Sequence, residues 1–162
     1  MISNNSTDLR THLIKLVKAL RRLHKLLIDA ETRHYGTVSS PLEHLNLVTT
    51  HPHFSWLQKL SGMMVELDER LDEETPVDIA TARDFRLALE TLIGPRTAVD
   101  GQFRERYLAM LHEAPEVAIA HGELRQTLNV LPVPPAPSAP PAPSAMPESS
   151  GSTEQKKFSA AD

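Results

Sequence analysis

Leucines recur at helical spacing through the first part of the chain. They alternate at intervals of four and three residues, at Leu9, Leu13, Leu16, Leu20, Leu23 and Leu27. This heptad spacing places them on one helix face, where they pack against other helices. Val17 and Ile28 widen the apolar stripe on one side. We therefore predict a long first helix over residues 8–34, and Gly36 is a suitable residue to end it.

The same spacing returns after residue 52 and predicts a second long helix. Its stripe begins with His53 and continues with the apolar residues Leu57, Leu60, Met64, Leu67 and Leu71. Shorter stripes predict a third helix over residues 76–93, capped by Thr75, and a fourth that starts near Gln102 and ends near Leu128.

Prolines mark the helix boundaries. Five of them fall where a helix would start, stop or break, at Pro41, Pro52, Pro76, Pro95 and Pro115. The segment from Ser40 to Glu43 fits a capping box, which predicts a short helix over residues 41–48. We expect either Thr50 or His51 to cap the restart of the chain that follows.

The absence of strand-like alternation predicts an all-α protein. Short connections between amphipathic helices favour an up-and-down four-helix bundle over residues 8–130, with breaks at Pro52 and Pro115. Residues 1–7 are expected to form a disordered N-terminus. Residues 131–162 hold eight of the thirteen prolines, together with alanine and serine, and this composition predicts a disordered C-terminal tail.

Composition excludes several kinds of chemistry. The chain has no cysteine, which excludes thiol catalysis, disulfides and cysteine-bound metals. A formal net charge of −4 argues against nucleic acid as a partner. The first residues lack the basic and apolar pattern of a secretory signal, and no stretch is apolar for the roughly 18 residues that a membrane span needs. We therefore expect a cytoplasmic protein without membrane association.

Histidines gather towards one end of the predicted bundle. Glu31 and His34 lie three residues apart near the end of the first helix, so both side chains point the same way. Carboxylate-bridged di-iron bundles use this Glu-x-x-His spacing twice, whereas we find it once. His44, His51 and His53 lie in the segment that leads into the second helix. We expect these residues to share one end of the bundle, either as a divalent-metal site or as hydrated helix-end side chains.

A basic face lies opposite the leucine stripe of the first helix. It consists of Lys15, Lys18, Arg22 and Lys25. Residues 8–34 contain seven lysines and arginines against three acids, whereas residues 66–78 contain seven acids against one arginine. In an antiparallel hairpin these two blocks lie side by side and partly neutralise each other. The alternative is that the basic face binds a protein partner.

The sequence contains no nucleophile elbow, phosphate-binding glycine loop or His-Glu-x-x-His motif, so we identify no catalytic residue. We expect a small helical bundle that acts as a non-catalytic protein-binding or scaffolding module. Its ligand would be a protein partner or a second copy of the chain. A metal-binding enzyme or sensor built on the His/Glu cluster is the alternative, and a divalent metal is the one cofactor it implies. An adaptor that uses the proline-rich tail is the third hypothesis.

Overall fold

The structure is a computed structural model that describes residues 2–95 and 101–133, with side chains from residue 7 onward. Every regular element in these ranges is helical, which confirms the all-α prediction. The elements are α1 (Ile2–Tyr35), α2 (Pro41–Thr50), the 3₁₀ helix η1 (Pro52–Leu57), α3 (Gln58–Asp72), α4 (Ile79–Ile93), α5 (Gly101–Glu113) and α6 (Pro115–Val130). No helix in these ranges combines the length and apolar character that a bilayer span needs.

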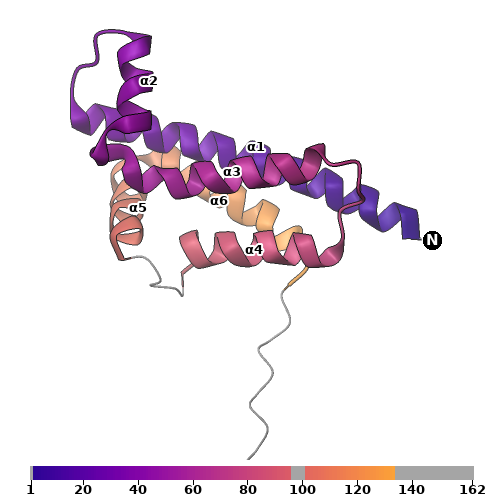
Figure 1. Ribbon diagram of the computed structural model, residues 1–162. Coiled ribbons are helices and arrows are strands. Elements are labelled where there is room, and N and C mark those ends of the chain that lie inside the picture. Colours follow the sequence, from indigo (N-terminus) through magenta and orange to yellow (C-terminus); the bar gives the residue numbers. More distant parts are fainter. Residues whose placement is uncertain (1, 96–100, 134–162) are drawn as a thin grey trace, which may run out of the picture.

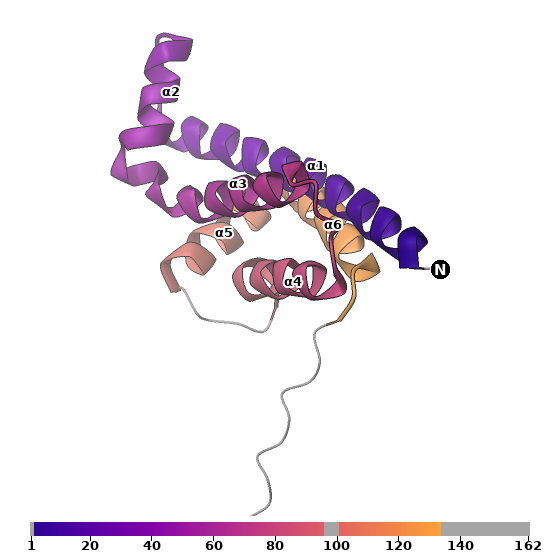
Figure 2. The same ribbon diagram turned by 45° about the vertical axis from the view of Figure 1, so that its right-hand side comes forward.

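The long helix α1 is the spine of the bundle. Helices α3 and α6 both pack along it, and α4 is the fourth long helix of the bundle. These four helices alternate in direction in chain order (Figures 1 and 2). Helix α5 runs across one end of the bundle and packs on α6 and α4. Helix α2 stands away from the bundle at that same end and contacts mainly η1. The expected four helices are therefore interrupted as predicted at Pro52 and Pro115, but the two short pieces, α2 and α5, point away from the bundle axis.

The core is formed largely by the predicted apolar stripes. Five leucines of the predicted α1 stripe are completely buried, namely Leu13, Leu16, Leu20, Leu23 and Leu27. Leu60 and Leu67 of α3 are also completely buried. Full burial of one leucine side chain contributes about 1.5–3 kcal/mol. Because five such leucines follow each other along α1, this helix has packing partners along most of its length.

The helix ends follow from local side-chain chemistry. Gly36 ends α1 with a φ of +125°, a conformation that favours glycine, and its N–H donates to the Thr32 carbonyl. The Ser40 hydroxyl accepts a hydrogen bond from the Glu43 N–H and so caps α2, as the capping box predicts. His51 caps η1, because its Nδ1 accepts a hydrogen bond from the His53 N–H.

Two helix starts differ from the prediction. Helix α4 begins at Ile79, and Asp78 caps it by accepting a hydrogen bond from the Thr81 N–H at 2.7 Å. The prediction that Thr75 caps this helix was wrong. Val77 is buried in the core just before the helix, so Asp78 occupies the capping position. Helix α1 begins at Ile2, well before the expected start near Asp8.

At the other end, Leu131 is buried, and its carbonyl accepts a hydrogen bond from the Arg86 guanidinium, so the packed part of the chain extends into the predicted tail. The remainder of that tail, residues 134–162, lies outside the described residues.

Two partly buried histidines make the free energy of unfolding depend on pH. Burial lowers the pKa of His24, whose Nε2 lies 2.9 Å from the Ser61 hydroxyl. Burial also lowers the pKa of His121, and the positive charge of Arg125 lowers it further. His121 Nδ1 lies 2.7 Å from the buried Tyr107 hydroxyl. Both imidazoles are therefore favoured as neutral groups in the folded protein.

We expect stability to fall as the pH drops below about 6.5, where histidines of the unfolded chain become protonated while His24 and His121 resist protonation. The sign follows because the unfolded state then binds more protons than the folded state. Urea unfolding between pH 7.5 and about 5 measures this slope, above the range in which carboxylates titrate. The double variant His24→Gln/His121→Gln should show a smaller slope, and an unchanged slope would contradict this account.

Candidate functional site

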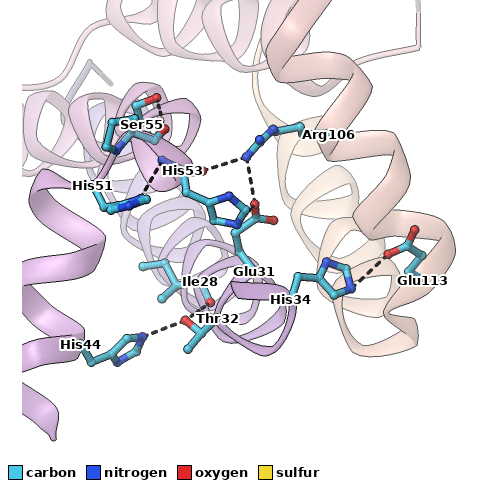
Figure 3. Close-up of polar contacts among 11 residues, drawn as sticks. Ile28, Glu31, Thr32, His34, His44, His51, His53, Ser55, Arg106 and Glu113 are labelled. Atoms are coloured by element: carbon cyan, nitrogen blue, oxygen red, sulfur yellow. Dashed lines mark hydrogen bonds and ion pairs between the residues drawn. The ribbon is translucent and has the colours of Figure 1, made fainter. Parts of the chain in front are cut away.

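Glu31 is the most buried charged residue among those described, with 2% of its surface exposed. It lies in the last turns of α1, on the leucine side of the helix. Arg106 from α5 donates a hydrogen bond to Glu31 Oε1 at 2.9 Å and another to the His53 carbonyl at 2.8 Å (Figure 3). A buried carboxylate requires such a partner, because an unpaired charge in the core is costly.

His53 approaches the same carboxylate from η1. Its Nε2 lies 2.8 Å from Glu31 Oε1, but the ring is not aligned for a hydrogen bond. Rings of Tyr35 and Phe54 lie 5.5 and 5.2 Å from the His53 ring, and Tyr35 also meets His51 edge-on at 5.1 Å. Glu31, His53 and Arg106 therefore join α1, η1 and α5 at the end of the bundle.

The other predicted metal ligands share this end but point elsewhere. His34 Nε2 lies 3.3 Å from Glu113 Oε2, and His44 Nε2 lies 2.8 Å from the Thr32 hydroxyl (Figure 3). His51 is turned towards the backbone of η1, where it serves as the cap. Of the five predicted ligands, Glu31 and His53 are brought together.

Metal chemistry needs more donors than this pair. Within residues 7–95 and 101–133, no group of three or more histidine, aspartate or glutamate side chains is arranged to hold an ion. The carboxylate of Glu31 instead faces the guanidinium of Arg106, a fixed positive charge. The metal hypothesis stays a prediction, and the observed geometry is that of a buried ion pair which fastens α5 to α1.

Sequence reasoning missed Arg106, the residue that pairs with Glu31. It stands between Phe103 and Tyr107, both of which are buried, so it lies beside the apolar stripe of α5. A positive charge next to a buried stripe is the one signal that points to it. Its partner, Glu31, is 75 residues away in sequence, and no local pattern relates the two.

The predicted basic face divides into paired and unpaired residues. Arg22 donates to Glu123 of α6 at 2.7 Å, and Lys25 pairs with Asp29 one turn further along α1. Lys15 and Lys18 are exposed, and neither side chain has a partner in the described part of the chain. Ile14, beside them, is 40% exposed.

The expected pairing between the basic residues of 8–34 and the acidic segment 66–78 occurs on the side of α1 that packs against α3. There Arg21 pairs with Asp68 of α3, and Arg10 donates to the carbonyls of Leu71 and Glu73. Arginines near the last carbonyls of a helix suit its negative end.

Helix α2 displays its apolar residues to solvent. Leu42 is 77% exposed and Leu45 is 62% exposed, and none of the ten residues of α2 is buried. Leu47 and Val48, further along the helix, rest partly against the core. Two exposed leucines at i and i+3 form one small apolar face, which we call the α2 leucine face.

Comparison with protein-family models, with curated proteins and with solved structures finds no match for this chain. The fold and the surfaces just described define the protein as an all-α helical bundle with a projecting apolar helix. Its function is therefore inferred from these surfaces.

Proposed function

We propose that this protein is a non-catalytic binding module that inserts the α2 leucine face into an apolar groove of a protein partner. The observation that supports this function is the outward display of Leu42 and Leu45 by a helix that buries none of its own residues. Short amphipathic helices that dock in grooves use apolar anchors at i and i+3 spacing.

Other occupants suit the α2 leucine face less well. A membrane surface attracts amphipathic helices that carry lysine or arginine, and residues 41–50 contain neither. Two hollows on the described surface are rimmed by charged residues, such as Glu66 and Asp84 in one and Arg86 and Glu90 in the other. Neither matches two leucines without charges, so a second copy of the chain is a poorer fit than a different protein.

Charged substitutions on α2 test this proposal. A photoreactive residue at position 45 of the full chain identifies the contacting protein in cells, and that protein is then purified and titrated. We expect Leu42→Glu/Leu45→Glu to weaken its binding about 100-fold, because two leucines lose their apolar burial. The matched control, Leu87→Glu/Ile119→Glu, changes two similarly exposed apolar residues on α4 and α6 and should leave binding unchanged.

Three outcomes would contradict the proposal. The first is equal loss of binding in both double variants, and the second is failure of position 45 to crosslink to any protein. The third is crosslinking between copies of this chain, which would make the α2 leucine face a dimer contact. Circular dichroism of each variant checks that the helices are retained.

A further inference from the structure

Helices α3 and α4 are consecutive in the chain, yet a hollow of about 290 Å³ separates part of their length. Its apolar side is formed by Met63 of α3 and by Phe85 and Ala88 of α4. This volume lies at the lower end of the range for small-molecule sites, so it suits a single inserted side chain better than a cofactor.

The rim of this hollow is acidic. Glu66 on α3 and Asp84 on α4 are exposed, and neither side chain has a hydrogen-bond or ion-pair partner among residues 7–95 and 101–133. Arg70, the positive group at the rim, is already engaged, because it pairs with Glu73 at 2.6 Å and donates to the Thr81 hydroxyl. We call this hollow with its two free carboxylates the acidic groove. It is complementary to an apolar side chain flanked by cations.

An apolar side chain flanked by cations is present elsewhere on the same molecule. On α1, Ile14 is exposed beside Lys15 and lies one turn before Lys18. The two lysines have no partner within the described part of the chain, whereas Arg22 and Lys25 are paired. Residues 14–18 therefore offer one apolar side chain and two free cations on adjacent turns, and we call them the α1 basic patch.

We propose that the acidic groove of one copy binds the α1 basic patch of a second copy, with Ile14 against Met63 and Phe85 and the lysines against Glu66 and Asp84. This self-association involves neither α2 nor its leucine face, so it goes beyond the proposed function and does not depend on it. The two surfaces are different, so the contact is heterologous, and a pair of bound copies leaves one groove and one patch free for further copies.

The contact is weak and sensitive to salt. Exposed ion pairs contribute little each and are screened at the ionic strength of the cell. We expect concentration-dependent growth beyond a dimer at low salt, with a dissociation constant of about 100 μM, and dissociation as salt is added. Sedimentation velocity of the full chain over a range of concentrations measures both.

Charge reversal on either surface tests the pairing. Glu66→Lys/Asp84→Lys and Lys15→Glu/Lys18→Glu should each weaken self-association at least tenfold. As a matched control, Glu69→Lys/Asp72→Lys changes two exposed acids of α3 that do not line the groove, and it should weaken association by less than threefold. Ala88→Phe, which fills the groove without changing charge, should also abolish association.

Mixing the two reversed variants gives the decisive result. The groove variant keeps an intact basic patch, and the patch variant keeps an intact groove. The reversed groove is in turn complementary to the reversed patch, so the mixture should recover the association that neither variant shows alone. A chain that carries all four reversals should associate again, because both partners have changed sign.

Several results would overturn the proposal. They are a monomeric wild-type chain at millimolar concentration and low salt, equal effects of the groove and control variants, and no association in the mixture. If the four-reversal chain fails to fold, as shown by circular dichroism, the mixture alone still decides. If the α2 leucine face fails to crosslink to any partner protein, the proposed function is contradicted but the expected results for self-association do not change.

Discussion

Replacing Arg106 with alanine is expected to lower the free energy of unfolding by about 3 kcal/mol. The substitution removes the hydrogen bond to Glu31, whose carboxylate is almost completely buried, and it leaves only His53 Nε2 nearby without hydrogen-bond alignment. It also removes the hydrogen bond to the His53 carbonyl, so α5 loses its buried ion pair with α1 and its hydrogen bond to η1. Urea unfolding at neutral pH measures the loss.

The matched control is Arg33→Ala at the same end of α1. Arg33 pairs with Glu116 on the surface, where its side chain is 61% exposed, so its removal should cost less than about 1 kcal/mol. The double variant Arg106→Ala/Glu31→Gln should recover part of the loss, because the buried charge is gone. A cost for Arg106→Ala no larger than that for Arg33→Ala would show that Glu31 needs no cationic partner.

A second large effect is expected at the centre of the core. Leu20 is completely buried in the middle of α1, and its replacement by alanine leaves a cavity. Such substitutions cost about 2–5 kcal/mol, which lowers the melting temperature of a domain of this size by roughly 10–20 °C. Thermal unfolding followed by circular dichroism measures the shift.

Leu45→Ala serves as the control, since the same side-chain change is made on α2, where the leucine is 62% exposed. Its effect on the melting temperature should be below about 2 °C. A similar shift in both variants would mean that α2 packs against the bundle far more closely than its exposure indicates.

The helices were predictable because their signals are local. The leucine spacing of α1 and α3, the Ser40 cap and the breaks at Pro52 and Pro115 each depend on residues within a few positions of one another. The position of Glu31 on the leucine side of α1 also follows from helical periodicity, whereas its almost complete burial was not predicted.

Features that depend on distant residues were not predictable. The direction of α5 depends on how the chain turns at Pro115 and on what Arg106 meets on α1, and no spacing in the sequence encodes either. Helix α2 is rich in leucine and resembles a buried helix in sequence, yet only the packed structure shows that Leu42 and Leu45 face outward. The predicted histidine cluster likewise separates, because His34 and His44 find nearer partners.

The pairing of α1 with α6 has a consequence for synthesis of the protein on the ribosome. Pro115, the first residue of α6, follows Tyr35, the last residue of α1, by 80 residues. At a translation rate of about 5–20 residues per second, roughly 4–16 s pass between synthesis of the end of α1 and synthesis of the start of α6. Helix α6 is the main packing partner of the leucine side of α1. During that interval α3 covers only part of it, so the nascent chain presents a long apolar strip of the kind that chaperones bind.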